Sequence, residues 1–269
     1  MPSQSNSLRP GLVIALISLP IFIGALDLTV VSAVLPHIIY ELEIPLQSGL
    51  DEAAWVVSGY LLAYSIAILL AGRLSDVFGR RNVYLGALAV FAIGSLLVAI
   101  ADQEPTQLVL RAIYLLTGDR PDPARVALRT LIAARMIQAL GGGAMVPVGM
   151  ALAGDLYPPR ELARPLGLIA AVDTAGWVVG HLYGGILTRF FDWRLIFWLN
   201  LPVCLLAFIW FWRLKLPQTQ RSQRQMDWLG ALLAAAALTV LNLGLGSNLE
   251  GGTSLAEAAL PPYALPAIL

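Results

Sequence analysis

The chain has 269 residues, of which 58% are hydrophobic and only 13% are charged, and its mean hydropathy is +0.75. This composition excludes a soluble globular domain and indicates an integral membrane protein, with the lipid bilayer as its main partner. The 17 basic and 17 acidic residues cancel, so no basic field for nucleic acid is expected. Cys204 is the single cysteine, which excludes an intrachain disulfide and a metal site built from cysteines.

A helix needs about 20 mainly apolar residues to cross a bilayer. Segments of this kind lie at 11–36, 53–72, 83–101, 130–153, 165–188, 194–213 and 228–246. A further apolar stretch, residues 262–269, is expected to begin an eighth helix that stays incomplete. The sequence therefore predicts an all-α membrane protein. We divide it into a six-helix bundle over 1–215, a basic cytoplasmic linker over 216–227, and an extra transmembrane helix with the incomplete eighth segment over 228–269.

Basic residues are unevenly divided between the two sets of expected helix ends. The set that includes the N-terminus holds Arg9, Arg73, Arg80, Arg81, Arg160, Arg164, Arg213, Lys215, Arg221 and Arg224. The opposite set holds Arg111, Arg120, Arg125, Arg129, Arg189 and Arg194, and its connections 41–52 and 247–260 carry acids and no base. Because cytoplasmic loops are enriched in Lys and Arg, we expect a multi-pass protein of the cell membrane with a cytoplasmic N-terminus.

Residues 102–129 form an unusually long connection on the expected outer side. Its apolar part, 108–116, is too short to span and carries Arg111, so we expect an amphipathic helix at the membrane interface. Residues 117–123, Thr-Gly-Asp-Arg-Pro-Asp-Pro, have the composition of a turn. This insertion either covers an outer vestibule or is a tolerated surface feature.

The stretch Gly72-Arg73-Leu74-Ser75-Asp76-Val77-Phe78-Gly79-Arg80-Arg81 separates the second and third expected spans. Its backbone and charges need water, so we predict a tight polar loop at a membrane surface. Gly72 and Gly79 are expected to let the helices turn and approach closely. Asp76 can accept hydrogen bonds from backbone or arginine, and the pair Arg80 and Arg81 marks the cytoplasmic side.

These ten residues resemble the signature loop of the major facilitator superfamily, Gly-x-Leu-Ala-Asp-Arg-x-Gly-Arg-Arg, and Ser75 and Val77 are the departures. Four spans resemble motifs of its multidrug:proton antiporter branch with fourteen helices, at residues 24–31, 135–144, 176–185 and 194–202. The resemblance runs from Leu12 to Gly246 and implies the N-terminal half of that fold, six helices in two three-helix repeats plus a linker helix. It also implies that the stretch 72–81 gates transport by locking against a second half.

Ionisable side chains inside spans are costly and usually face a cavity or a partner. Asp27 lies midway in the first span, where a carboxyl group can exchange a proton near neutral pH; the alternative is a packing aspartate paired permanently to a donor. Arg135 in the fourth span needs a carboxylate or several carbonyls. Asp27 is its candidate partner, because the resemblance places these helices face to face. Alternatively, Arg135 extends to the outer interface and binds nothing. Gln138 and Gly141 complete the fourth-helix motif.

The fifth span holds Asp173 and His181, which fall about 80 degrees apart on a helix and can line one cavity wall. Each is a candidate for proton coupling or, alternatively, a packing residue, with Asp173 hydrogen-bonded to a neighbouring helix. His181 replaces the proline of the family motif and removes its kink. The motif's glycines keep their spacing and are expected to pack closely against another helix: Gly176, Gly180, Gly184 and Gly185.

The sequence shows no nucleotide-phosphate loop, zinc-ligand spacing or nucleophile grouping, so we expect no enzyme, metal or cofactor, and an ion gradient as the energy source. The resemblance to the antiporter branch implies that this is a proton gradient. The leading hypothesis is the N-terminal half of a proton-coupled exporter of hydrophobic or cationic drugs, which works as a homodimer or with a separate second half. Two alternatives stay open: a membrane scaffold subunit that does not transport, and a truncated, inactive transporter fragment.

Overall fold

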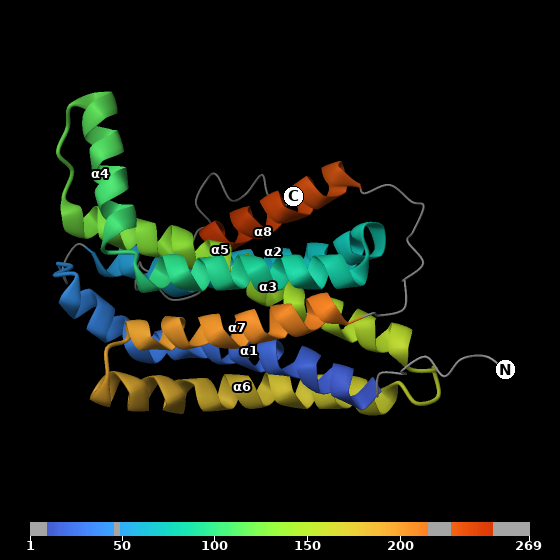
Figure 1. Ribbon diagram of the computed structural model, residues 1–269. Coiled ribbons are helices and arrows are strands. Elements are labelled where there is room, and N and C mark those ends of the chain that lie inside the picture. The colour runs from blue at the N-terminus through green and yellow to red at the C-terminus, as the bar shows by residue number, and fades with distance from the viewer. Residues whose placement is uncertain (1–9, 46–48, 215–226, 250–269) are drawn as a thin grey trace. The chain divides into compact units, whose positions relative to one another are not determined.

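The computed structural model describes residues 10–45, 49–214 and 227–249, and all regular structure in this part is helical (Figure 1). The helices are α1 (Pro10–Glu41), α2 (Leu50–Phe78), α3 (Arg80–Ala99), α4 (Glu104–Thr117), α5 (Pro123–Leu156), α6 (Ala163–Phe190), α7 (Arg194–Arg213) and α8 (Trp228–Leu249). The chain divides into two compact units, Met1–Gln223 and Arg224–Leu269. Helices α1 to α7 belong to the first unit.

Six helices of the first unit are long and apolar enough to cross a membrane: α1, α2, α3, α5, α6 and α7. They confirm the six spans predicted for the bundle. The main difference lies at α5, which begins at Pro123 rather than at 130. Asp122 caps this end, because its carboxylate accepts a hydrogen bond of 3.1 Å from the Ala124 N–H, and Pro123 suits the first turn. The last part of the insertion 102–129 therefore belongs to α5.

The predicted seventh segment is helix α8 of the second unit. Its side chains are described as far as Leu241, so its crossing of the membrane stays a prediction. Residues 216–226 of the basic linker and the stretch 262–269 lie outside the described residues.

The predicted polar loop at 72–81 is wrong, because the turn between α2 and α3 is the single residue Gly79. Its φ of 91° favours glycine, since a side chain is strained there. The preceding residues continue α2 and satisfy their own backbone: the Gly79 N–H donates to the Ser75 carbonyl at 3.0 Å, and the Ser75 hydroxyl donates to the Gly72 carbonyl at 2.7 Å. Gly72 therefore lies inside a helix and makes no turn.

The six long helices form a bundle in which α1 and α5 are central. Helix α1 packs against α6, α5 and α7, whereas α5 packs against α2, α3 and α1. The expected contact between the first and fourth spans is thus confirmed. In the most apolar 18-residue stretch of α1, 67% of the residues are buried, whereas in the corresponding stretch of α6 only 17% are buried. Helix α6 therefore lies at the edge of the bundle and exposes most of its surface.

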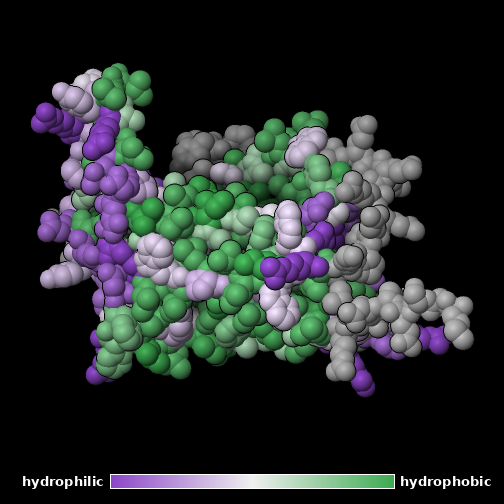
Figure 2. All heavy atoms as spheres, viewed as in Figure 1, coloured by the Kyte–Doolittle hydropathy of each residue, from purple (hydrophilic) through white to green (hydrophobic). Residues whose placement is uncertain are grey.

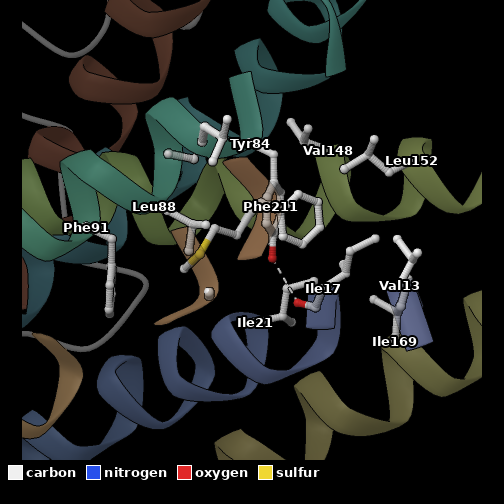
Figure 3. Packing of buried hydrophobic residues seen from close by; sticks show 14 of the residues in the cluster. Val13, Ile17, Ile21, Tyr84, Leu88, Phe91, Val148, Leu152, Ile169 and Phe211 are labelled. Carbon is white, nitrogen blue, oxygen red and sulfur yellow. Dashed lines mark hydrogen bonds between the residues drawn. The ribbon is translucent and has the colours of Figure 1, made fainter. Parts of the chain in front are cut away.

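Two apolar clusters form most of the core. One, the Tyr84 cluster, includes Ile17, Tyr84, Phe91 and Phe211, and the Tyr84 hydroxyl donates to the Ile17 carbonyl at 2.9 Å (Figure 3). The other, the Val34 cluster, includes Val30, Val34, Val56, Leu131 and Phe197. The two clusters occupy successive segments of the same helices, so any residue between them lies deep in the bundle.

Candidate functional site

A layer of polar side chains crosses the bundle between the two apolar clusters. In α1, Asp27 lies between Ile21 of the Tyr84 cluster and Val30 of the Val34 cluster. The corresponding segments of the other helices contribute Ser95 from α3, Arg135 and Gln138 from α5, and Asn200 from α7. All five side chains are buried. We call this set the polar layer.

An ion pair between Asp27 and Arg135 forms the centre of the polar layer. Arg135 Nη1 lies 2.5 Å from Asp27 Oδ2, and Nη2 donates to the Asp27 main-chain carbonyl at 3.1 Å. Both side chains are 1% exposed. The predicted pairing is therefore present, and the alternative in which Arg135 extends to the outer interface is wrong. A buried charge needs this arrangement, because desolvation is offset only by close pairing and further hydrogen bonds.

Three amide or hydroxyl side chains supply those further hydrogen bonds. The Gln138 amide donates to Asp27 Oδ1 at 3.0 Å and to the Ser95 hydroxyl at 2.8 Å, while its oxygen accepts from Arg135 at 2.5 Å. The Asn200 amide donates to Asp27 Oδ1 and to Ser95, both at 3.3 Å. The Asp27 carboxylate therefore links α1 directly to α5 and α7, and Ser95 of α3 joins the network through Gln138 and Asn200. A change in the charge of Asp27 alters this whole network.

Aromatic rings enclose the arginine. The Tyr60 ring of α2 lies under the guanidinium, with 3.9 Å between Arg135 Cζ and the ring centroid, and the Phe197 centroid lies at 5.7 Å. Such stacking stabilises a desolvated cation. Arg135 Nε and the Tyr60 hydroxyl are both buried and have no hydrogen-bond partner among the described residues. The layer thus keeps unused hydrogen-bonding capacity beside its ion pair, which is typical of functional sites.

Close contact between α3 and α5 positions Gln138 in the layer. A Cβ on Gly94 would collide with the Gln138 backbone, and a Cβ on Gly141 would lie 2.6 Å from the Ala87 carbonyl oxygen. Small residues let two helix backbones approach in this way. Gly141 of the predicted fourth-helix motif therefore packs against α3, and Gln138 contacts Asp27 directly.

Glycines of α6 fix the position of α1 beside the layer. A Cβ on Gly176 would lie 2.6 Å from Ala25 Cβ, one on Gly184 would lie 2.8 Å from Val30, and one on Gly180 would collide with Thr29. The structure confirms the predicted packing role of these three glycines. Gly185 differs, since a Cβ there would meet no described atom within 4 Å.

Asp173 and His181, the candidates on α6, lie outside the polar layer. Asp173 is half-buried, and its Oδ1 atom is buried without a hydrogen-bond partner among the described residues, so the predicted packing bond is absent at that atom. His181 is exposed. Neither bonds to the other, and a role in proton coupling stays a prediction for both.

At one end of the bundle, which we call the Arg80 end, arginines of the predicted gating segment tie helices together. Arg80 Nη1 donates to the Ala151 carbonyl at 2.6 Å and to Asp155 at 2.5 Å, and its Nη2 lies 3.5 Å from Asp76. Arg81 donates to the carbonyls of Phe211 at 3.2 Å and Trp212 at 2.5 Å, at the last turn of α7. This segment thus holds α3 to α5 and α7.

The opposite end, the Arg194 end, has its own ionic cluster. Arg194 donates to Glu41 at 2.7 Å and to Asp102 at 2.6 Å, and Trp193 Nε1 donates to Glu41 at 2.6 Å. These contacts link α7 to the end of α1 and to the residues after α3. Charged clusters thus lie at both ends of the helices, with the polar layer between them.

Sequence reasoning assigned no role in the site to Ser95, Asn200 or Tyr60. Each is one polar group within an apolar run, which is a weak signal alone. Asn200 carried the strongest indication, since amides within membrane spans hydrogen-bond across helices.

Six membrane-length helices around a buried ion pair define a multi-pass membrane protein of the transporter class. The family model of the Major Facilitator Superfamily matches residues 17–248. The chain therefore belongs to the Major Facilitator Superfamily of membrane transporters.

Curated relatives include the triacylglyceride transporter of Mycobacterium tuberculosis, 35% identical over 255 residues, which are 94% of this chain and 44% of the relative. The triacylglyceride transporter of Mycolicibacterium smegmatis is 31% identical over 254 residues, 93% of this chain and 40% of the relative. The chain thus spans less than half the length of these relatives.

Solved structures show the same fold. The inward-open xylose transporter XylE from E. coli has a TM-score of 0.60 at 17% identity, covering 91% of this chain and 57% of that one. The human organic anion transporter MFSD10 has a TM-score of 0.53 at 18% identity, covering 87% of this chain and 55% of that one.

Proposed function

We propose that this chain forms one six-helix half of a proton-coupled exporter of hydrophobic, lipid-like molecules in the cell membrane. The observation that carries the proposal is the buried pair of Asp27 and Arg135, linked by hydrogen bonds to α3, α5 and α7. An ionisable group inside a membrane bundle marks proton relays and transport pathways.

The polar layer suits coupling because it has two distinct charge states. With Asp27 ionised, its charge balances Arg135 and its oxygens accept from Gln138 and Asn200. When Asp27 is protonated, the guanidinium loses its counter-charge and the contacts between α1 and α5 weaken. A ligand or gradient that favours one state therefore shifts the helices that meet at the layer.

Hydrophobic substrates suit the chemistry of the site. The described layer pairs its one carboxylate, Asp27, with Arg135, so no free charge there selects a charged molecule. The relatives in Mycobacterium and Mycolicibacterium are named triacylglyceride transporters. We therefore place neutral lipids first among the substrates.

Cationic drugs are the second candidate class, as expected for an antiporter of the multidrug branch. Asp173 favours this class, because the buried Oδ1 of its carboxylate has no hydrogen-bond partner among the described residues. A carboxylate with unused acceptor capacity on a largely exposed helix can bind a cation.

We further propose that a second six-helix bundle, whichever chain supplies it, packs against α6. This helix exposes a hollow of about 590 Å³ lined by Ala170, Ala171, Thr174, Ala175, Val178 and Val179. Small side chains of this kind let another membrane helix approach closely. The transport path then lies between the two bundles and opens by rocking. The distribution of basic residues along the sequence, ten in the set that includes the N-terminus against six in the other, supports a cytoplasmic position for the N-terminus and the Arg80 end.

Proton flux in proteoliposomes tests this function. The chain is reconstituted with its second bundle, identified by crosslinking and native mass spectrometry, and a pH dye is enclosed. We expect a triacylglyceride gradient to drive proton movement in the native protein, and Asp27→Asn to abolish it while Asp27→Glu retains part of it. A tetraphenylphosphonium gradient replaces the lipid to test the cationic class.

The outcomes separate the hypotheses. Absence of flux with both substrates in the native assembly contradicts a proton-coupled carrier and favours a scaffold. Native flux in Asp27→Asn would exclude Asp27 from coupling, and flux with the cation alone would replace lipids by drugs as the substrate class.

A further inference from the structure

Helix α4 differs from every other described helix of the first unit in its direction. Figure 1 shows α4 lying crosswise to the bundle helices, at the Arg194 end, instead of running along them. It has 14 residues, too few to cross a bilayer. A helix lying across the end of a membrane bundle runs along the plane of the bilayer surface.

Contacts at the start of α4 anchor it to the bundle. In its first turn, the Thr106 hydroxyl donates to the Ala101 carbonyl at 2.6 Å, and just before the helix Asp102 pairs with Arg194 of α7. After it, Gly118 has a φ of 76°, a conformation that favours glycine, and caps the helix through a 2.9 Å bond to the Tyr114 carbonyl. The chain then reaches Asp122, whose carboxylate caps the start of α5. Hence the start of α4 is anchored to the bundle, whereas its capped end projects away from it (Figure 1).

The surface of α4 has three sides. Thr106 is buried and Ile113 half-buried, on the side that packs against the bundle. Gln107 and Arg111, four residues apart, share an exposed polar side. The third side is apolar and exposed: Leu108 is 60% exposed, Leu115 81% and Leu116 85%. Large leucines on a capped helix are costly in water, so this third side needs an apolar neighbour.

The third side faces along the bundle helices. Figure 2 shows hydrophobic residues gathered on the side of α4 that faces along the bundle, and hydrophilic residues on the side that faces away from it. The bundle helices are long and apolar enough to cross a membrane, and the hydrophobic side of α4 faces along them. An amphipathic helix with this division of faces lies at the boundary between headgroups and acyl chains.

We propose that α4 is an interfacial helix that lies in the bilayer leaflet at the Arg194 end, with Leu108, Leu115 and Leu116 among the acyl chains. Arg111 and Gln107 then contact headgroups and water. The occupant of the exposed apolar side is the same bilayer that holds the bundle. This inference does not depend on the substrate or on proton coupling, because it rests only on the faces and direction of α4.

Site-directed spin labelling in lipid nanodiscs tests the position of α4. Single cysteines are introduced as Leu115→Cys and, as the matched control on the polar side, Gln107→Cys, in a Cys204→Ala background. We expect the ratio of oxygen to nickel-chelate accessibility to be several-fold higher at position 115 than at 107, because oxygen concentrates among acyl chains and the chelate stays in water. Both side chains are exposed, so the melting temperature should match that of the background.

Two results would overturn the proposal. Equal, high chelate accessibility at both positions would place α4 in water, as a free arm. Low accessibility to both reagents at position 115, with an immobilised spectrum, would show that a protein covers this side. The double variant Leu115→Glu and Leu116→Glu, read at a label on Leu108→Cys, adds a second measurement: chelate accessibility at position 108 should rise, and an unchanged value would contradict acyl-chain contact.

Discussion

The ion pairs of the polar layer and those at the helix ends use the same chemistry in different surroundings. Asp27 and Arg135 are each 1% exposed, whereas in the pair of Arg129 with Glu52 the arginine is 68% exposed. Both pairs have an N to O distance of 2.5 Å. Distance therefore does not separate them; the availability of water does, since water replaces a lost partner at the ends and not in the layer.

Because of this difference in burial, the charges at the helix ends and those in the polar layer contribute differently to stability. At the ends, arginines join helices whose backbone carbonyls and carboxylates are near water, so each contact contributes modestly. In the layer, one carboxylate contacts side chains of α5 and α7, and its loss leaves a buried cation. The comparison predicts that effects of mutation fall steeply from the layer to the ends.

The largest effect is expected from Asp27→Asn. The amide keeps the shape but leaves the buried Arg135 without a counter-charge, which costs about 3–5 kcal/mol of unfolding free energy. The double variant Asp27→Asn with Arg135→Met should be more stable than Asp27→Asn alone, because the uncompensated charge is gone. Reversible unfolding in mixed micelles measures both. Equal stability of the single variant and the native protein would mean that water reaches the layer.

A smaller effect is expected from Arg80→Ala at the Arg80 end. The substitution removes hydrogen bonds from the guanidinium to the Ala151 carbonyl and Asp155, and a hydrogen bond to a charged group contributes about 1.5–3 kcal/mol. We expect a loss within this range, below that of Asp27→Asn, in the same unfolding measurement. Arg80→Lys keeps the charge and should recover only part of it, because an ammonium group does not reproduce the fork of donors. Full recovery would show that charge alone acts there.

The sequence predicted the layer's central pair but not the turn beside Arg80. The need of Arg135 for a carboxylate follows from the cost of a lone charge in lipid. The choice of Asp27 as its partner came from the resemblance to the major facilitator superfamily, which implies that the first and fourth spans face each other. The loop at 72–81 was misread because glycines and charges indicate a break, yet a helix that satisfies its own backbone can carry them to a membrane surface. Only Gly79, with its positive φ, makes the turn.

The remaining site residues depend on helix rotation, which a single sequence encodes weakly. Asn200 and Ser95 enter the layer because α3 and α7 present those faces at that depth, and Gly94 sets the distance between α3 and α5. On α6, the glycines that contact α1 turn His181 outward, away from the polar layer. Hydropathy finds the six spans, whereas packing decides which polar residues meet.

A still smaller effect inside the layer is expected at Tyr60. Tyr60→Leu removes the ring under Arg135, and a desolvated cation–π contact contributes about 2 kcal/mol. Tyr60→Phe keeps the ring and removes a hydroxyl that has no hydrogen-bond partner among the described residues, so it should be neutral or slightly stabilising. A destabilising Tyr60→Phe would reveal a partner for that hydroxyl, and would make the layer a larger network than the one described.

The smallest effect is expected for the exposed pair at the Arg194 end. Arg129→Ala removes the contact with Glu52, and exposed ion pairs contribute about 0.2–1 kcal/mol. Added salt should reduce this difference, because exposed charges are screened, and should leave the cost of Asp27→Asn nearly unchanged. Measuring both variants at low and high ionic strength therefore tests the comparison directly. If salt reduced both costs equally, water and ions would reach the buried pair as they reach the exposed pair. Burial would then not distinguish the polar layer from the helix ends.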